Sequence, residues 1–201
     1  MLSYLALGDS YTIGEQVPAA ENFPSQTAAL LRKHYFLQIR EPRIVAVTGW
    51  TTDELTEGIR KEHIQETYDL VTLLIGVNNQ YRGRDIENYK KEFALLLNKA
   101  ILFANGRSKR VFVLSIPDWG VTPFAADRDR AAIAREIDQY NIANRAIAVA
   151  YRCHYIDITP STRQHGTDES YLTPDKLHYS GKEYGHWAAQ LAPAMAAVLK
   201  R

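Results

Sequence analysis

The residues best suited to chemistry lie in short polar segments spread along the whole sequence. Ser10 follows Gly8 and Asp9 near the start, and Asp175 stands three residues before His178 near the end. A serine hydroxyl becomes an effective nucleophile when a base takes its proton, and a histidine oriented by a carboxylate is a common base. Ser10, His178 and Asp175 could therefore attack an acyl group together.

Acyl transfer also needs hydrogen-bond donors for the oxygen that becomes negatively charged in the transition state. The candidate donors are the backbone N–H of Ser10, the backbone N–H of Gly49 and the side-chain amide of Asn78. Glycine at position 49 lets the backbone approach a substrate closely, because glycine has no Cβ. Each segment alone also fits an ordinary turn or cap, so the prediction depends on their joint occurrence.

Five short runs rich in aliphatic and β-branched residues must position these segments. The runs are almost continuously apolar, which is typical of strands buried on both faces of a parallel sheet. The sequence therefore predicts strands over residues 2–7, 43–47, 70–75, 111–116 and 154–158.

Helical patterns lie between the expected strands. Thr51 and Glu54 have the spacing of a capping box at a helix N-terminus, as do Ser180 and Glu183 before the last helix. Apolar residues recur on one helical face in two further segments, 85–103 and 131–151.

Strand and helix alternate five times, which predicts a parallel sheet covered by helices on both faces. We expect an α/β protein with three α/β/α layers, formed as a single domain over residues 1–201. Ligands of such sheets bind beyond the carboxyl ends of the strands. Ser10, Gly49 and Asn78 each follow one of the first three strands, and Asp175 and His178 lie in the long connection after the fifth. We therefore expect all five residues to meet at one edge of the sheet.

The overall composition is that of an ordinary globular protein, with 46% hydrophobic and 23% charged residues. A net charge of +1 gives no strong field to attract nucleic acid, and no apolar run approaches the ~20 residues of a membrane span. No cluster of cysteine and histidine has metal-site spacing, so we expect neither a metal nor a cofactor. The single Cys153 favours a reducing, cytoplasmic compartment; periplasmic or secreted protein is the alternative if a signal peptide precedes this sequence.

Several aromatic and amide residues flank the expected site and are candidates for substrate binding. An aromatic lining fits an acyl chain or a sugar ring, although core packing is the alternative for each residue. The connecting loops are mostly short, which predicts an open cleft and favours small or short-chain esters. The candidates are Trp50, Asn79, Tyr81, Trp119 and Tyr179.

In identity and order these segments resemble the four blocks of the SGNH (GDSL-type) hydrolase superfamily. The matching residues are Gly8-Asp9-Ser10, Gly49, Gly76-Val77-Asn78, and Asp175 with His178. The resemblance implies a flavodoxin-like fold with five parallel strands and a Ser–His–Asp ester hydrolase that needs no metal. Two departures bear on subfamily and substrate: Asn79 stands where the family often has aspartate, and Tyr179 where proline often follows the histidine.

The expected activity is that of a serine esterase acting on small-molecule carboxylic esters through an acyl-enzyme, with short-chain or acetyl esters favoured. The same residues would also serve an acyltransferase, a thioesterase or a lysophospholipase, and these alternatives stay open. A non-catalytic binding module with this fold would leave the joint occurrence of the serine, asparagine and Asp-x-x-His unexplained.

Overall fold

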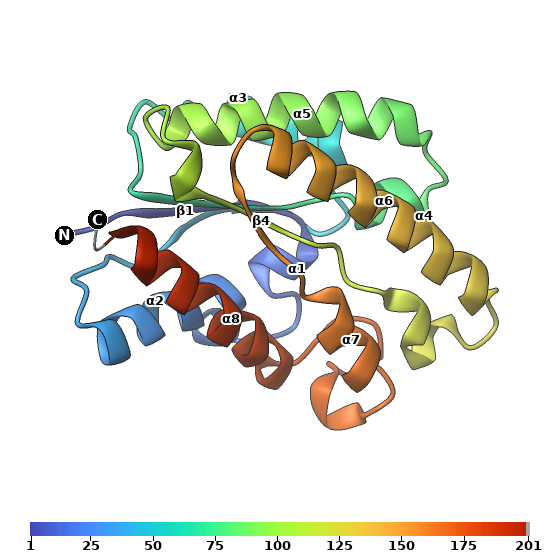
Figure 1. The fold of residues 1–201 in the computed structure, drawn as a ribbon. Helices are drawn as coiled ribbons and strands as arrows, with labels where there is room; N and C mark the ends of the chain where they lie inside the picture. Colours follow the sequence, from blue (N-terminus) through green and yellow to red (C-terminus); the bar gives the residue numbers. More distant parts are fainter. Residues whose placement is uncertain (200–201) are drawn as a thin grey trace.

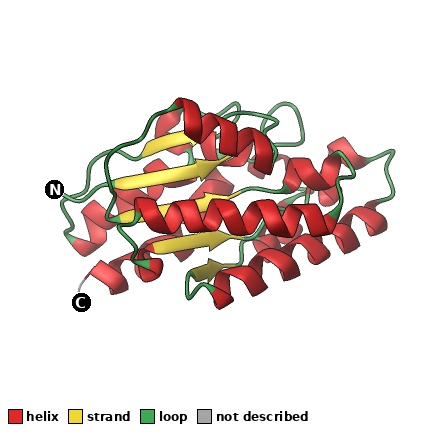
Figure 2. Cartoon of the chain, turned by 90° about the horizontal axis from the view of Figure 1, so that it is seen from above, coloured by secondary structure: helices red, strands yellow, loops and turns green. Residues whose placement is uncertain are grey.

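The five apolar runs of the sequence form one sheet in which every neighbouring pair of strands is parallel. The computed structural model describes residues 1–199. The strand order is β2-β1-β3-β4-β5, which is the order of flavodoxin-like sheets. Because helices cover both faces of the sheet, the predicted three-layer α/β/α fold is confirmed (Figure 1, Figure 2). The strands are β1 (Tyr4–Gly8), β2 (Arg43–Ala46), β3 (Leu70–Leu74), β4 (Val111–Leu114) and β5 (His154–Ile156).

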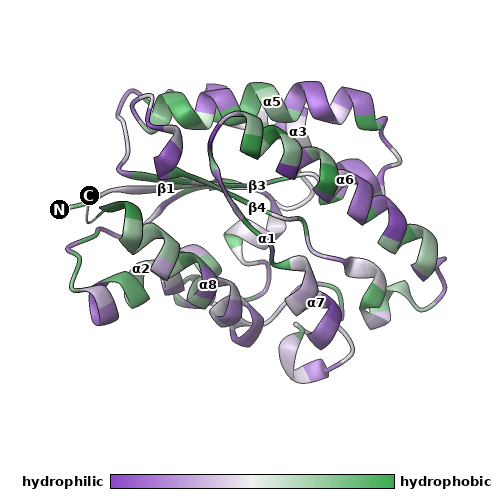
Figure 3. Cartoon of the chain, viewed as in Figure 1, coloured by the Kyte–Doolittle hydropathy of each residue, from purple (hydrophilic) through white to green (hydrophobic). Residues whose placement is uncertain are grey.

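The centre of the sheet is closed to water on both faces. Every residue of β1, β3 and β4 is buried, and hydrophobic residues run through this part of the molecule (Figure 3). The edge strands β2 and β5 are only partly buried. The almost continuous apolar runs of the central strands thus reflect burial on two sides.

In the described part of the chain, the helices of ten or more residues form the two outer layers (Figure 1). Two of them lie together on one face of the sheet, α2 (Phe23–Tyr35) and α8 (Gly181–Leu199). The other face carries α3 (Thr52–Lys61), α5 (Ile86–Phe103) and α6 (Arg130–Ala150). Shorter elements are α1 (Ser10–Ile13), α4 (Val77–Tyr81), α7 (Thr159–His165) and 3-10 turns at Ala19–Glu21, Ser108–Arg110, Trp119–Val121, Pro123–Ala125 and Glu169–Tyr171.

The sequence predicts the helical connections unequally well. α2 is the helix expected between the first two strands, and Asn22 caps it by accepting a hydrogen bond from the Ser25 N–H at 2.9 Å. The residues after β5, expected to lack regular structure, contain α7 and one 3-10 turn. α7 has seven mostly polar residues and buries only Thr159 and Thr162, so no hydrophobic period marks it.

The two expected capping boxes have different outcomes. Thr51 and Glu54 form the predicted box at the start of α3. The box predicted for Ser180 and Glu183 is wrong, because Glu183 is fully buried and accepts hydrogen bonds from other partners, His165 Nδ1 at 2.7 Å and Trp187 Nε1 at 2.8 Å. No helix among residues 1–199 is long and apolar enough to cross a membrane.

Candidate active site

The candidate nucleophile is the first residue of the short helix that follows β1. Asp9 caps this helix, accepting a hydrogen bond from the Tyr11 N–H at 3.0 Å. A Cβ on Gly8 would lie 2.1 Å from Thr12 Oγ1 and 2.5 Å from the Leu74 carbonyl oxygen. The chain can therefore bend from strand to helix at this point only with glycine at position 8, and the bend leaves Ser10 at the carboxyl end of β1.

The candidate base and its carboxylate lie in the loop between α7 and α8. His178 Nδ1 is 2.6 Å from Asp175 Oδ2, while Asp175 Oδ1 accepts hydrogen bonds from the backbone N–H groups of Leu177 and His178, both at 2.9 Å, and from Thr173 Oγ1 at 2.8 Å. Gln16 Nε2 donates to Asp175 Oδ2 from the other side.

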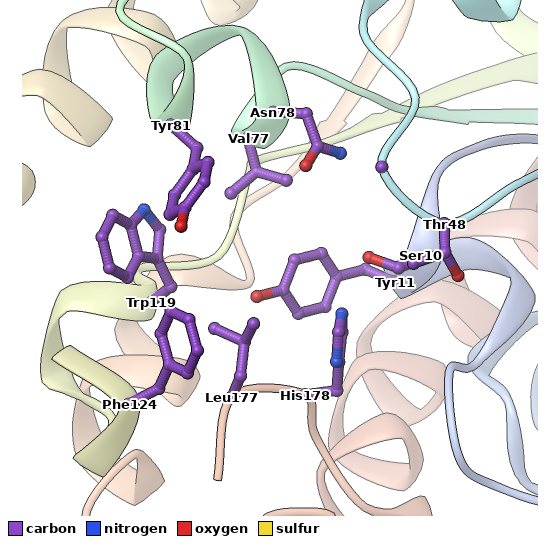
Figure 4. Close-up of a pocket in the computed structure, with 11 residues that line it drawn as sticks. Ser10, Tyr11, Thr48, Val77, Asn78, Tyr81, Trp119, Phe124, Leu177 and His178 are labelled. Atoms are coloured by element: carbon purple, nitrogen blue, oxygen red, sulfur yellow. The ribbon is translucent and has the colours of Figure 1, made fainter. Parts of the chain in front are cut away.

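These contacts set the charge of the pair. Burial raises the pKa of Asp175, but the hydrogen bonds from His178, Leu177 and Thr173 outweigh it and lower the pKa to about 2. An ionised carboxylate only accepts hydrogen bonds, so His178 Nδ1 must carry the proton that it donates. The other ring nitrogen, Nε2, is then free to take a proton from a nucleophile, and it points toward the side of the pocket where Ser10 lies (Figure 4).

The Ser10 N–H lies after β1, and the other two predicted oxyanion donors lie on the segments that follow β2 and β3. Gly49 is in a left-handed conformation with φ of 87°, inside a turn closed by a 3.2 Å hydrogen bond from the Trp50 N–H to the Val47 carbonyl. Asn78 Nδ2 donates one hydrogen bond to the Trp50 carbonyl at 2.9 Å. A carboxamide nitrogen has two hydrogens, so the second remains available to a ligand oxygen.

One pocket brings the catalytic candidates together. Ser10, Gly49, Asn78 and His178 all line a cavity of about 210 Å³ (Figure 4). Asp175 is not part of the lining but is bonded to His178 Nδ1. The rest of the lining is mainly apolar and consists of Tyr11, Thr48, Val77, Tyr81, Trp119, Phe124 and Leu177. Tyr81 and Trp119 therefore share the pocket with the catalytic candidates, and their role in substrate binding stays a prediction.

The apolar wall opposite the catalytic pair has a fixed orientation. Trp119 is 5% exposed, and its Nε1 donates to Gln80 Oε1 at 2.7 Å. Gln80 in turn donates to Glu136 Oε2 on α6 at 2.7 Å. Tyr81 and Phe124 pack edge-on to the Trp119 ring, with centroids 5.2 and 6.2 Å away. Trp119 is therefore held in place, and the more exposed rings of Tyr81 and Phe124 flank it at the same end of the pocket.

Three of the predicted substrate-binding residues lie outside this cavity. Asn79 is fully buried and bonds to Thr52 twice, accepting from its N–H at 3.1 Å and donating to its Oγ1 at 2.7 Å. Trp50 packs its ring over Gly58 of α3. Tyr179 is fully buried, and its hydroxyl donates to the Asp118 carbonyl at 3.3 Å. Proximity in sequence to the catalytic residues does not fix side-chain direction, which explains these corrections.

Three lining residues that directly adjoin a predicted catalytic or oxyanion residue were not among the substrate-binding candidates. Tyr11 follows Ser10, Val77 precedes Asn78 and Leu177 precedes His178. The only signal for them was that adjacency, since their types are equally common in protein cores.

Asp9 has an unusual environment immediately beside the nucleophile. It is fully buried, and its Oδ2 has no hydrogen-bond partner among the described residues. Burial raises the pKa of Asp9 to about 7, and the hydrogen bond from the Tyr11 N–H offsets only part of that rise. Asp9 is thus a buried carboxyl with a structural capping role. Among residues 1–199, no group of three histidine, cysteine, aspartate or glutamate side chains is placed to hold a metal.

Comparison with known proteins identifies the family. The sequence profile of the GDSL-like lipase/acylhydrolase family matches residues 6–188, which include all four blocks of the site. The chain belongs to this family. The match confirms the resemblance drawn from the sequence blocks and places the chain among ester-hydrolysing enzymes. No curated protein matches the sequence.

Solved structures of low sequence identity share the fold of this GDSL-like family member. TesA aligns with a TM-score of 0.75 at 16% identity, over 96% of this chain and 97% of its own. The psychrotrophic esterase EstA from Pseudoalteromonas sp. aligns with a TM-score of 0.75 at 13% identity over the whole of both chains. The acetyl xylan esterase AlAXEase aligns with a TM-score of 0.73 at 18% identity, over 96% of this chain and 99% of its own.

Proposed function

We propose that this GDSL-like family member is a serine esterase that hydrolyses short-chain carboxylic esters through an acyl-enzyme. Ser10 Oγ attacks the ester carbonyl while His178 Nε2 takes the hydroxyl proton, and Asp175 stabilises the resulting imidazolium. The Ser10 N–H, the Gly49 N–H and the Asn78 amide hold the oxyanion. The C–O bond to the alcohol then breaks, and the leaving alcohol receives the proton from His178.

The second half of the cycle uses the same groups. Water attacks the acyl carbon of the Ser10 ester while His178 Nε2 takes one of its protons. The bond to Ser10 Oγ breaks, the serine recovers a proton from His178, and the carboxylic acid leaves. No group beyond the residues of the pocket is needed for either half.

The observation that carries this proposal is that His178, joined to Asp175 at 2.6 Å, lines the same pocket as Ser10, Gly49 and Asn78. These five residues come from four separate places in the sequence, and an ordinary turn or cap would not require them to meet. The low pKa of Asp175 supports its role, since the carboxylate stays ionised throughout the neutral range.

The size of the pocket favours a small acyl group. Its volume of about 210 Å³ lies below the roughly 300–1,000 Å³ of sites for drug-sized ligands. At the aromatic end of the pocket, the buried and hydrogen-bonded Trp119 ring limits how far an acyl chain can extend. An acetylated sugar is the second candidate substrate, because aromatic rings also pack on sugar rings and two neighbours in fold, an acetyl xylan esterase and an acetyl-xylooligosaccharide esterase, are named for such substrates.

A substrate panel tests the proposal. Acyl esters and thioesters of graded chain length, together with acetylated sugars, are assayed with the wild type and with Ser10→Ala as the control. We expect the highest kcat/KM for the shortest acyl groups and no turnover by Ser10→Ala, with an unchanged circular dichroism spectrum. Preference for long acyl chains would contradict the substrate assignment. An added alcohol acceptor separates hydrolysis from acyl transfer, because only a transferase forms mainly the new ester.

A further inference from the structure

The oxyanion donor Gly49 lies in a turn with an unusual backbone requirement. The turn runs from Val47 to Trp50, and the hydrogen bond from the Trp50 N–H to the Val47 carbonyl closes it. Its two central residues are Thr48 and Gly49, so the Gly49 N–H belongs to the central peptide of the turn. In turns with glycine at the third position and positive φ, this central peptide is rotated by about 180° compared with the common type I turn. A return of Gly49 from φ of 87° to negative φ would therefore direct its N–H away from the pocket.

Arg82 binds this turn at Gly49, the residue with the positive φ. Arg82 follows α4, and its Nη2 donates to the Gly49 carbonyl at 2.6 Å. Its Nη1 donates to Glu54 Oε1 at 3.2 Å, in the first turn of α3. Glu54 is itself fixed by the capping box, in which its Oε2 accepts a hydrogen bond from the Thr51 N–H at 2.9 Å. The guanidinium therefore links Gly49 to a rigid helix end.

Arg82 adds to the hydrogen bond that Asn78 makes in the same turn. Asn78 Nδ2 holds the carbonyl of Trp50, and Arg82 holds the carbonyl of the preceding residue, Gly49. A Cβ built on Gly49 would lie 3.7 Å from Arg82 Nη2, so the cation lies directly beside the donor segment. Asn79, where the family often has aspartate, is neutral and bound to Thr52, so it brings no negative charge to this side of the site.

We propose that Arg82 is a positioning residue for the oxyanion hole: it keeps Gly49 in the conformation that aims its N–H at the reacting carbonyl oxygen. This inference depends on the proposed esterase function. Arg82 acts through Gly49, and it is not a member of the pocket lining. Its effect should appear in the transition state, where the oxyanion forms, more than in substrate binding.

The chain offers a matched control two residues further on. Arg84 also pairs with a carboxylate at the start of α3, Asp53, at 2.5 Å, and its side chain is 30% exposed compared with 41% for Arg82. The guanidinium of Arg84 bonds to no residue of the oxyanion hole. Loss of Arg84 removes an ion pair to the first turn of α3, as loss of Arg82 does. Only loss of Arg82 also leaves the Gly49 carbonyl without the hydrogen bond from the guanidinium.

The test compares Arg82→Gln, Arg82→Lys and Arg84→Gln with the wild type on one short-chain ester. We expect Arg82→Gln to lower kcat by roughly 10- to 100-fold with KM within about twofold, less than the loss of a whole oxyanion donor. Arg84→Gln should keep the wild-type kcat. Arg82→Lys should recover part of the loss, since one ammonium group can still bind the Gly49 carbonyl but lacks the two-pronged geometry of arginine. Melting temperatures of the Arg82→Gln and Arg84→Gln variants should agree.

A second readout reports the oxyanion hole directly. The rate of inactivation by a phosphonate ester, whose phosphoryl oxygen occupies the oxyanion position, should fall in the same ratio as kcat in Arg82→Gln. Equal kcat values and inactivation rates for Arg82→Gln and Arg84→Gln would overturn the role of Arg82. Failure of the esterase proposal is a different result, namely that Ser10→Ala retains turnover.

Discussion

Replacement of Asp9 by asparagine should change the way in which stability depends on pH. Asp9 is fully buried, and burial raises its pKa to about 7 from an ordinary value of 3.8. Asparagine keeps the side-chain oxygen that caps α1 by accepting the Tyr11 N–H. The variant therefore removes the titration of this group while keeping its main structural contact.

The sign and size of the effect follow from linkage. Between about pH 4 and pH 7 the folded wild type keeps a proton on Asp9 that the unfolded chain has lost, so stability falls as pH rises through this range. At about 1.4 kcal/mol for each pKa unit, the total loss is on the order of 4 kcal/mol above pH 7. Asp175 adds no slope in this window, because its pKa of about 2 lies below it and its stabilising effect is lost only on acidification from about pH 4 through pH 2.

Urea unfolding of wild type and Asp9→Asn at pH 5, 6, 7 and 8 measures this effect. The variant should be the less stable protein, or nearly equal, at pH 5 and should gain on the wild type at each higher pH. Histidine titrations cancel in the difference between the two proteins. Asp168→Asn is the control, since that exposed carboxyl has a lowered pKa and should give a profile parallel to that of the wild type. Parallel profiles for Asp9→Asn as well would refute a buried, protonated Asp9.

Two further predictions concern activity. Asp175→Asn should lower kcat by roughly 10³- to 10⁴-fold at pH 7 with little change in KM, because asparagine can donate to Nδ1 and stabilise the wrong tautomer of His178. A pH–rate profile measures this loss. A loss of kcat below tenfold would contradict the pairing of Asp175 with His178. Trp119→Ala should open the aromatic end of the pocket and raise the ratio of octanoyl to butyryl ester kcat/KM by roughly tenfold, since added methylene contacts give discrimination of that order. An unchanged ratio would place the acyl chain elsewhere.

The sequence predicted the sheet and the meeting of the catalytic candidates, because both depend on patterns that are local and strong. A strand buried on two faces must be almost continuously apolar, and parallel strands bring their carboxyl ends to one edge. Ser10, Gly49 and Asn78 could therefore be placed together without any knowledge of contacts. The single-domain organisation over residues 1–201 stays a prediction.

Side-chain direction was much harder to predict. Trp50, Asn79 and Tyr179 all stand next to residues of the site, yet each points into the surrounding packing. The position of Glu183 fits a capping box, but a buried contact with His165 outcompetes that local bond. Such choices depend on partners distant in sequence, which a local pattern does not contain.

Covalent labelling of the nucleophile tests the central claim most directly. A fluorophosphonate is incubated with the wild type and with Ser10→Ala, and intact-mass and peptide mass spectrometry locate the adduct. The account predicts one phosphonyl group per chain, attached to Ser10, loss of esterase activity in proportion to labelling, and no adduct in Ser10→Ala. An adduct on another residue, or ester hydrolysis by Ser10→Ala near the wild-type rate, would contradict it.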